Sequence, residues 1–506
     1  MTGFTGLDLA VLLAYLAGVT AWGAWLGRGQ SGGRDYFLGN RDLPWLAVML
    51  SVVATETSTL TFLSIPGVSY LGSMGFLQLT LGYLVGRVAI SVLLLPAYYR
   101  GDLNTAYALL EDRFGLGVRR FTSSVFMVTR LLADSVRLFA TAIPLALVTG
   151  WDYPVSIAAI GVATVIYTYF GGIRAVVWVD VLQMCLYLVG ALVALVALQT
   201  LVPSGWPGIF AEAQEAGKLA VFDFSADPAV AYTFWAGLLG GGFLTMASHG
   251  TDQLIVQRLL TCRSLRDSQK ALVGSGVVVI GQFALFLLVG LGLWTFYGAR
   301  SFARSDEIFA LFIVEELPTG LTGLLIAGVF AAAMSSLSSS VNSLASATAY
   351  DLWAPLAGAE DDERRILRVG KVFTLVWAGL LIGGAILFIP LSRGTSAVEV
   401  ALAVASIVYG GLLGAFALGV LSDRADSRSA IIGMIAGIGT VAAIWAVGRV
   451  DPAAGGEWPA IMRWVRAYLP IAWPWFVPIG TAVTVAVGLL LGRGPDRTAE
   501  EAAAVA

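Results

Sequence analysis

Hydroxyl side chains crowd one apolar stretch of the chain. Residues 331–343 have the sequence AAAMSSLSSSVNS, in which six serines and an asparagine lie inside a hydrophobic run. On a helix with about 3.6 residues per turn, one face carries four of these side chains: Ser335, Ser338, Ser339 and Asn342. A polar group left unsatisfied in lipid is costly, so this face must meet other helices, water or a ligand. Close helix packing is the alternative to ligand binding, because Ser and Ala let backbones approach closely.

Three carboxylates lie within apolar segments, where an ionisable group costs at least ~2.5–3.5 kcal/mol on insertion scales. Glu56 and Asp252 fall in polar interruptions of two segments, and Asp180 lies early in a third. A hard alkali cation prefers oxygen ligands, and one carboxylate with a few hydroxyls can replace its water while neutralising its charge. Neutral carbonyls and hydroxyls bind such an ion more weakly, which is useful where the ion must also leave. Asp180 is therefore a candidate cation ligand.

Arginines in the same segments are candidates for binding an anion. Arg87 lies in the middle of one segment, and Arg130, Asp134 and Arg137 share another at spacings of four and three residues. That spacing predicts a network of ion pairs on one helix face. A purely structural network and an arginine free to bind an anionic substrate both stay open, because paired charges inside a bundle need no ligand.

The composition defines the class of protein that must position these side chains. The chain has 506 residues, of which 58% are hydrophobic and 12% charged, whereas roughly 25% of residues are charged in soluble domains. The sequence therefore predicts an all-α polytopic membrane protein. Two cysteines and a single histidine argue against a disulfide framework, a thiolate metal site and HExxH zinc chemistry. The lack of a GxxxxGK[ST] run argues against an ATP-driven pump.

Thirteen hydrophobic segments have the length of a membrane span. They are Leu7–Leu26, Leu43–Tyr70, Gly75–Tyr99, Phe121–Thr149, Val155–Phe170, Ala175–Val202, Tyr232–Leu260, Ala271–Tyr297, Leu321–Tyr350, Val372–Ile389, Val398–Leu421, Ala430–Val447 and Ile471–Leu491. The first follows no basic residue, so we expect a retained helix and not a signal peptide. If it runs inward, most loop Lys and Arg lie inside, including those of residues 28–41, 100–120, 258–270 and 364–371. This asymmetry predicts a multi-pass cell-membrane protein with its N-terminus outside and its C-terminus in the cytoplasm.

Two of the segments are interrupted by polar residues and glycines. One contains ATETST at residues 54–59, and the other contains GGG at 240–242 and SHGTDQ at 248–253. The interruptions lie five helices apart, which is typical of inverted-repeat transporters whose ligands bind where the helices unwind. The alternative is that Pro and Gly are simply frequent in membrane helices.

The pairing of the two interruptions predicts how the chain is divided. The predicted parts are a first extra helix with an inner loop (1–41), a first five-helix repeat (42–202), an outer loop (203–231), a second, inverted five-helix repeat (232–421), and two C-terminal helices with a short tail (422–506).

Four motifs stand in a fixed order along the chain. They are YFLGNRDLPWLAVMLSVVATETSTLTFLSIPG (Tyr36–Gly67), GGIRAVVWVDVLQ (Gly171–Gln183), DQLIVQR (Asp252–Arg258) and AAAMSSLSSSVNS (Ala331–Ser343). Together they resemble the sodium/solute symporter family, the group that contains the sodium/glucose, sodium/proline and sodium/sialic acid cotransporters. The resemblance implies a five-plus-five inverted-repeat (LeuT-type) core, preceded by one helix and followed by two. It also implies sodium-coupled transport by alternating access.

The resemblance implies sodium sites on the serine-rich helix. In such symporters one ion lies between the first core helix, which is broken, and the eighth core helix. The matching ligands in this sequence are the carbonyls of Ala54, Thr57 and Ala332 and the hydroxyls of Ser335 and Ser336. Some members, the sialic acid type among them, hold a second ion with a carboxylate and further serines. The matching residues are Asp180, Ser335, Ser338 and Ser339. We therefore expect two sodium ions per cycle.

The substrate contacts that the resemblance implies come from the breaks and their neighbours: Glu56, Ser58, Thr61, Gln78, Arg87, Arg130 and Asp252. Arg130 lies near the place where sialic acid carriers hold a carboxylate with an arginine, which favours an organic acid or an acidic sugar. Glu56 and Asp252 favour an amine or a hydroxyl-rich solute, unless they pair with the arginines. Thr61 stands where sugar carriers have an amide, so glucose is not implied. We expect His249 to bind a backbone carbonyl freed at the second break, and Tyr409 to help close the outer gate.

The leading functional hypothesis is a sodium-coupled symporter that imports a small organic solute, with an organic acid or acidic sugar favoured over a neutral sugar, polyol or amino acid. The rival from another class is a solute sensor that acts through a separate partner. A channel lacks support because no ring of charges is visible, and an enzyme lacks support because no nucleophile and base stand together. The expected partners are a small-molecule substrate, sodium ions and the lipid bilayer, with no nucleic acid.

Overall fold

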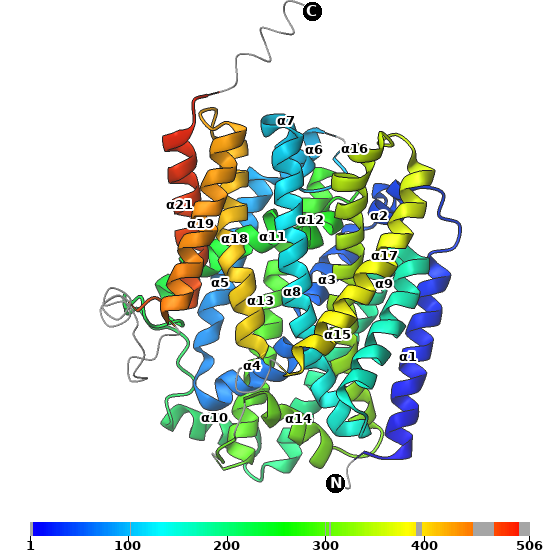
Figure 1. Cartoon of the computed structure of the whole chain (residues 1–506). Coiled ribbons are helices and arrows are strands. Elements are labelled where there is room, and N and C mark those ends of the chain that lie inside the picture. Colours follow the sequence, from blue (N-terminus) through cyan, green and yellow to red (C-terminus); the bar gives the residue numbers. More distant parts are fainter. Residues whose placement is uncertain are drawn as a thin grey trace, which may run out of the picture.

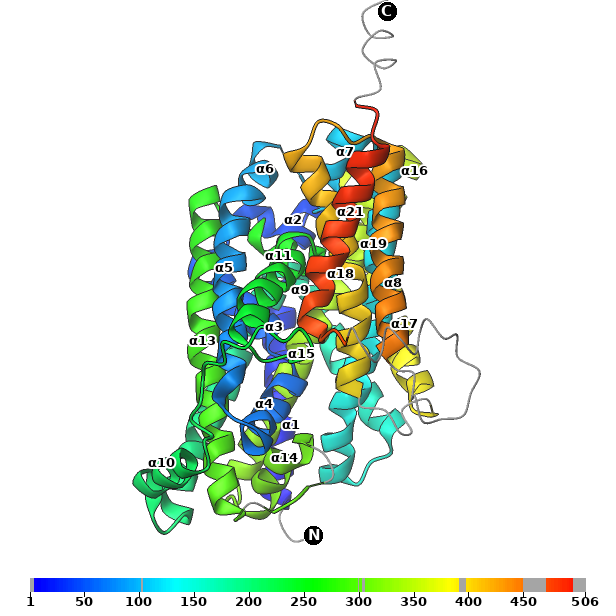
Figure 2. The same ribbon diagram turned by 90° about the vertical axis from the view of Figure 1, so that its left-hand side faces the viewer.

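Long helices standing side by side form most of the described protein (Figures 1 and 2). The computed structural model describes residues 4–101, 103–298, 300–302, 305–390, 397–448 and 470–494. The start of α1 and the end of α21 lie at opposite ends of the bundle (Figure 1). An odd number of membrane crossings produces this arrangement.

The spanning helices follow the predicted segments. In the described ranges they are α1 (Gly6–Leu26), α3 with α4 (Trp45–Glu56, Thr59–Leu71), α5 (Leu77–Leu93), α8 (Leu116–Thr149), α9 (Tyr153–Leu201), α11 with α12 (Gly241–Gly250, Gln253–Leu259), α13 (Leu265–Phe296), α15 (Leu321–Ala347), α17 (Glu363–Phe388), α18 (Ala397–Leu421), α19 (Ser427–Gly448) and α21 (Phe476–Leu491). Because α9 contains two of the predicted segments, this architecture agrees with the predicted thirteen spans.

Short helices close the two ends of the bundle (Figure 1). The end reached by α21 carries α2 (Gly33–Leu38), α6 (Leu95–Arg100), α7 (Ala108–Phe114) and α16 (Ala354–Ala357), and the opposite end carries α10 (Gly205–Glu215) and α14 (Ser305–Glu315). Single turns are η1 (Gly39–Arg41), η2 (Met74–Phe76), η3 (Ala236–Gly240), η4 (Thr348–Trp353) and η6 (Trp473–Trp475).

The longest helix, α9, consists of two membrane spans joined at a kink. Its 49 residues would extend ~74 Å at 1.5 Å per residue, more than twice the ~30 Å of a hydrocarbon core. Gly172 interrupts the helix with φ 55° and ψ −157°. A Cβ at this position would lie 2.5 Å from the carbonyl oxygen of Tyr36, so only glycine fits. The kink separates the two helices predicted on either side of it.

Two helices are broken inside the bundle, at both predicted places. The axes of α3 and α4 differ by 61°, and Ser58 begins α4 as its N-cap, with Oγ accepting from Thr61 N at 3.4 Å. Asp252 begins α12 in the same way, with Oδ1 accepting from Leu254 N at 2.9 Å. The polar residues that interrupt the hydrophobic segments therefore start new helices.

Glycines bring α5 directly against the second broken helix. A Cβ on Gly82 would lie 2.0 Å from the carbonyl oxygen of Gly237, and a Cβ on Gly86 would lie 2.4 Å from that of Gly242. The four-residue spacing of Gly82 and Gly86 is the GxxxG pattern of close helix pairs in membranes. This contact fixes α5, which carries Arg87, beside the second break.

The first helix caps the serine-rich helix. The carboxylate of Asp8 is buried and accepts hydrogen bonds from the backbone N–H groups of Gly320 at 2.7 Å and Gly323 at 2.8 Å. These groups lie at the N-terminal end of α15, where the helix dipole favours a negative charge. Asp8 therefore orients α15 against α1.

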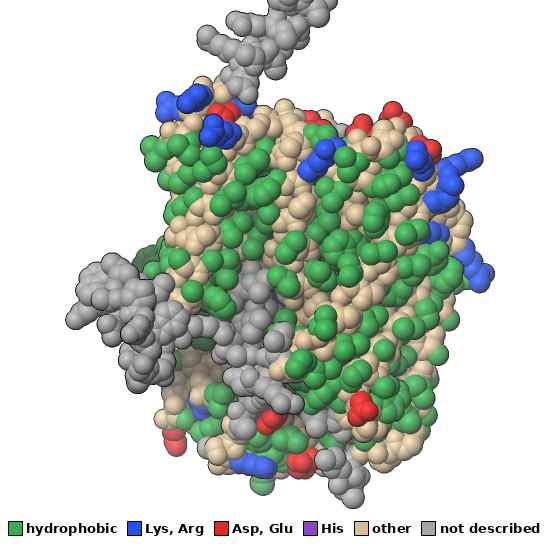
Figure 3. Space-filling view, in the orientation of Figure 1, with side chains coloured by type: hydrophobic (Ala, Val, Ile, Leu, Met, Phe, Trp, Pro, Cys, Tyr) green, Lys and Arg blue, Asp and Glu red, His purple; other side chains and the backbone are tan. Residues whose placement is uncertain are grey.

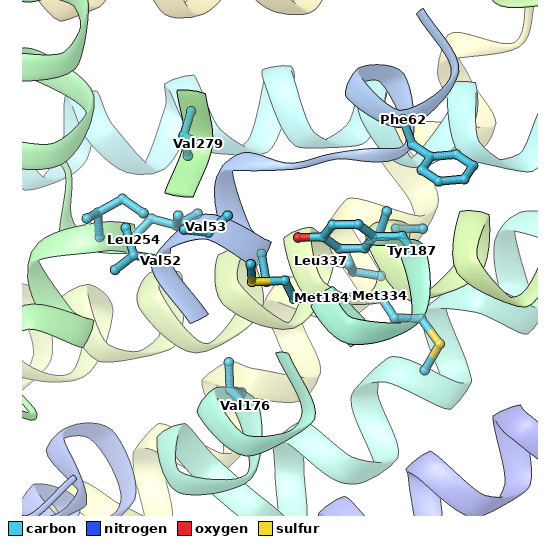
Figure 4. Close-up of a cluster of buried hydrophobic side chains, with 14 of the residues drawn as sticks. Val52, Val53, Phe62, Val176, Met184, Tyr187, Leu254, Val279, Met334 and Leu337 are labelled. Carbon is cyan, nitrogen blue, oxygen red and sulfur yellow. The ribbon is translucent and has the colours of Figure 1, made fainter. Parts of the chain in front are cut away.

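Apolar side chains fill the space around the first break. Figure 4 shows Val53 from α3, Phe62 from α4, Leu254 from α12 and Val279 from α13 in one buried cluster with Leu337 from α15. On the outside, hydrophobic side chains cover most of the height of the bundle, and Lys and Arg gather mainly at the end that carries α7 and α16 (Figure 3). This surface is that of a membrane-embedded protein.

Candidate functional site

The polar face of α15 is buried against three other elements. The four side chains predicted for this face are fully buried: Ser335, Ser338, Ser339 and Asn342. Thr55 Oγ1 on α3 lies 3.3 Å from Ser339 Oγ, and Gln257 Nε2 on α12 donates to Asn342 Oδ1 at 2.7 Å. Ser335 Oγ donates to Asp180 Oδ1 on α9 at 2.7 Å. Other helices are therefore among the partners of this face, as one of the expected alternatives.

The first break lies opposite the middle of α15. Thr55, before the break, contacts Ser339, and Thr59, after it, donates from Oγ1 to the carbonyl of Val329 at 3.0 Å. The broken helix and α15 therefore run antiparallel here, and Thr57 between the two contacts accepts at Oγ1 from Gln282 Nε2 on α13 at 2.5 Å. Of the five residues predicted for the first cation at this junction of the two helices, Ala54 and Thr57 flank Thr55 at the end of α3, and Ala332, Ser335 and Ser336 lie on α15 between its two contacts with the broken helix.

The break makes backbone oxygens available at this junction. Carbonyls at the end of a helix lose their partner within it, and Thr57 adopts φ −84° and ψ 92°, outside the helical region. Across the junction, Ser336 Oγ donates back to the carbonyl of Ala332 at 3.2 Å. The five oxygens all come from uncharged groups, which are ligands that a hard monovalent cation accepts.

Asp180 lies at the centre of a second cluster, fully buried. Ser51 Oγ donates to its Oδ2 at 2.5 Å and Ser335 Oγ to its Oδ1 at 2.7 Å. Arg258 Nη2 donates to Oδ2 at 3.0 Å. The other two serines predicted for the second cation lie one turn along α15 and donate to the carbonyl of Ser335, Ser338 at 3.0 Å and Ser339 at 2.6 Å.

Two members of this cluster, Ser51 and Arg258, have no role in the sequence-based site. The assignment of Arg258 to an inner loop is wrong, because α12 extends to Leu259 and holds the guanidinium in the bundle with no exposed surface. The sequence did contain an indication that Arg258 belongs to the site, because it lies at the end of the apolar run after Asp252, inside one of the four motifs.

The two arginines nearest the breaks are paired with the two carboxylates there. Arg87 Nη2 donates to Glu56 Oε2. The same nitrogen lies 2.9 Å from His249 Nε2, and Ser248 Oγ lies 2.8 Å from His249 Nδ1. The expectation that His249 binds a backbone carbonyl is wrong, because both ring nitrogens lie against side chains. This network links α3, α5 and α11.

The second pair joins α8, α12 and α18. Arg130 binds Asp252 through two nitrogens, with Nε at 3.1 Å from Oδ2. Tyr409 OH donates to the same Oδ2 at 3.0 Å and lies 2.6 Å from Arg130 Nη2. The predicted network on α8 is also present, since Asp134 lies 3.6 Å from Arg130 and 3.3 Å from Arg137. Arg130 is therefore shared between a structural network and the second break.

The remaining predicted substrate residues have separate surroundings. Ser58 and Thr61 form the N-cap of α4, whereas Gln78 donates to the carbonyl of Tyr232 at 3.2 Å and accepts from the Asp223 N–H at 2.9 Å. Gln78 thus holds the loop before the second broken helix. A small cavity of about 20 Å³ lies between α4, α8 and α15, and it is lined by Ser58, Thr59, Asp134, Arg137, Leu138, Thr141, Ala333, Ser336 and Leu337. Its volume suits about one water molecule or ion.

Two inverted halves, each with a broken helix and ionisable groups at the break, define a secondary transporter of the LeuT-type fold. The chain belongs to the sodium:solute symporter family, whose family model matches residues 36–437. It is therefore a sodium-coupled symporter, in a family of transporters and not of enzymes.

Known relatives cover most of the chain. The human sodium/iodide cotransporter is 30% identical over 86% of this chain and 69% of its own length. The sodium/sialic acid symporter SiaT of Proteus mirabilis (strain HI4320) is 30% identical over 86% of this chain and 88% of its own. A solved structure of a Na⁺-coupled sialic acid symporter, described as substrate-bound, outward-open and with a novel Na⁺ site, superposes with a TM-score of 0.84 at 27% identity and covers 96% of this chain and 98% of that one.

Proposed function

We propose that this protein imports an organic acid or an acidic sugar together with sodium. The observation that carries the proposal is the pairing of Glu56 with Arg87 and of Asp252 with Arg130. Unpaired, these carboxylates would favour a cationic or hydroxyl-rich solute. Paired, they are neutralised, and they do not oppose the approach of an anion.

The chemistry of the first cation junction supports an anionic solute as well. Its five oxygens are uncharged, so sodium bound there brings a positive charge that no ligand of the junction cancels. An uncompensated charge in a low-dielectric interior is costly. An anionic solute bound nearby lowers that cost, and each of the two ligands then favours the binding of the other. Two of the relatives are named for iodide and for sialic acid, which are both anions.

The proposed ligands follow from this arrangement. Sodium binds the carbonyls of Ala54, Thr57 and Ala332 and the hydroxyls of Ser335 and Ser336, and a second ion uses Asp180, Ser335, Ser338 and Ser339. The solute carboxylate binds Arg130, and its polar groups bind Ser58 and Thr61 at the N-cap of α4. Glu56, Gln78, Arg87 and Asp252 hold these groups in position. Sodium drives uptake if it favours the outward-facing, binding-competent state.

We further propose that the end of the bundle with α7 and α16 faces the cytoplasm, with the N-terminus outside. The gathering of Lys and Arg at that end supports this orientation.

Uptake into proteoliposomes tests the function. The purified protein is reconstituted with an inward sodium gradient and offered labelled acids, acidic sugars, neutral sugars and amino acids. We expect sodium-dependent, saturable accumulation of an acid. Arg130→Gln should abolish uptake of that acid, whereas Arg137→Gln, on the same helix and with a partly exposed side chain, should retain it. Accumulation of a neutral solute, equal in the wild type and in Arg130→Gln, would overturn the proposal. Solute binding without any accumulation would favour a sensor.

A further inference from the structure

Arg258 places a cation of the protein itself on the cluster around Asp180. Its side chain has no exposed surface, and each of its three nitrogens donates a hydrogen bond. Nε donates to Ser51 Oγ at 2.9 Å and Nη1 to the carbonyl of Leu254 at 2.7 Å. Nη2 donates both to Asp180 Oδ2 at 3.0 Å and to Ser339 Oγ. The guanidinium thus binds two of the four residues proposed to hold the second sodium ion.

The charges of this cluster already balance. Among the described residues, Arg258 is the one ion-pair partner of Asp180, so the cluster contains one negative and one positive charge. A sodium ion added beside this pair would leave a net positive charge with no exposed surface. Such a buried, uncompensated charge costs several kcal/mol. Sodium and the guanidinium therefore compete for the same carboxylate.

Several buried polar atoms beside the cluster have no hydrogen-bond partner at ordinary distance within the described residues. Gln183 lies one turn from Asp180 on α9, is fully buried, and within the described part of the chain neither its amide oxygen nor its amide nitrogen has a partner at ordinary hydrogen-bonding distance. The hydroxyls of Tyr15 and Tyr187 also lack one there. Buried polar atoms are normally satisfied. An amide oxygen of this kind is a suitable ligand for a hard cation.

We propose that Arg258 and a sodium ion are alternative occupants of the Asp180 cluster. In the arrangement seen here the guanidinium serves as the cation, and a second sodium ion enters only when the guanidinium withdraws. This inference rests on the proposed sodium coupling and adds the residue that regulates its second ion.

The position of Arg258 connects that exchange to the second broken helix. The residue lies at the end of α12, the seven-residue helix that follows the second break. Its hydrogen bonds join α12 to α3, α9 and α15. Withdrawal of the guanidinium releases these contacts. Binding of sodium at the second site therefore opposes the packing of α12 against α3, α9 and α15.

Equilibrium binding of radioactive sodium to the purified protein tests the exchange. We compare the wild type with Arg258→Met, which keeps the length of the side chain without its charge, and with Arg258→Lys, which keeps the charge. Ser51→Ala removes one partner of the guanidinium and none of the proposed sodium ligands. Asp180→Asn removes the carboxylate for which both cations compete.

Arg258→Met should bind a second sodium ion at least ~10-fold more tightly than the wild type, because a unit charge next to the site is removed. Ser51→Ala should change the affinity in the same direction by about 3-fold or more, because it loosens the guanidinium. Arg258→Lys should resemble the wild type, and Asp180→Asn should bind one ion.

Two different results separate the inference from the proposed function. If the wild type binds sodium at one or two sites and neither Arg258→Met nor Ser51→Ala tightens the second, the inference is wrong while sodium coupling stands. If no form of the protein binds sodium above background, both are wrong. Ser51→Ala decides the question if Arg258→Met fails to give a folded protein.

Discussion

Substitution of Ser336 by alanine should raise the sodium concentration needed for half-maximal uptake. The Ser336 hydroxyl is one of five uncharged oxygens proposed for the first ion. Within the described residues it donates to the carbonyl of Ala332 on its own helix at 3.2 Å. A hydrogen bond to a charged group contributes about 1.5–3 kcal/mol. The free energy contributed by a neutral ligand of a monovalent ion lies near the low end of this range, because a water molecule in the adjoining cavity can replace the ligand. About 1.4 kcal/mol corresponds to roughly a tenfold change in half-saturating sodium.

The matched control is Ser343→Ala. Ser343 lies seven residues further along the same helix, is buried, and donates from its hydroxyl to a carbonyl of that helix, Ser340 O at 3.1 Å. Both variants therefore lose a similar local hydrogen bond, and only Ser336 lies at the first break. The assay is sodium titration of uptake in proteoliposomes at fixed solute. Equal half-saturating sodium in the two variants would refute the assignment of the first ion to this junction.

Three further outcomes concern stability, each measured as the unfolding temperature of the purified protein. Gly82→Ala should destabilise the folded protein by about 1–3 kcal/mol, because the new Cβ would lie 2.0 Å from a carbonyl oxygen. The control is Gly281→Ala, whose Cβ would meet nothing within 4 Å and should not cause this loss of stability. Asp8→Ala should cost about 1–2 kcal/mol by removing the cap of α15; an unchanged unfolding temperature would contradict that role. At Asp426 partial burial opposes ionisation, but hydrogen bonds from the N–H groups of Ser429 and Arg493 outweigh it and lower the pKa. The ionised Asp426 therefore stabilises the folded protein above the ordinary pKa of an aspartate, and this stabilisation is lost as the pH falls through the lower pKa of the folded state. In Asp426→Asn the unfolding temperature should no longer show this loss at acid pH.

Helix positions were predictable because each hydrophobic segment carries its own evidence. A run of apolar residues as long as the bilayer must satisfy its backbone internally, so it forms a helix whatever its neighbours are. The breaks were predictable for the same local reason. Residues such as Ser58 and Asp252 interrupt apolar runs and have side chains that cap the next helix.

The pairing of the buried charges was not predictable in this way. Asp180 and Arg258 are 78 residues apart, and Arg130 and Asp252 are 122 residues apart. Asp180, Arg130 and Asp252 are each identifiable as an expensive charge in an apolar segment. The partner of each depends on how the two repeats pack, which no local pattern records. Arg258 was also ambiguous, because a basic residue at the end of a span is typical of an inner loop.

The balance of buried charges near the breaks connects the solute to the number of ions. Within the described residues, Arg87, Arg130, Arg137 and Arg258 are matched by Glu56, Asp134, Asp180 and Asp252. The unloaded core therefore has no net charge there. One sodium ion with one monovalent acid preserves that neutrality, so the membrane potential does not act on the loaded carrier. A second sodium ion adds one charge and about 2.3 kcal/mol per 100 mV of driving force. Whether uptake responds to voltage at a fixed sodium gradient therefore reports whether Arg258 has yielded Asp180 to sodium.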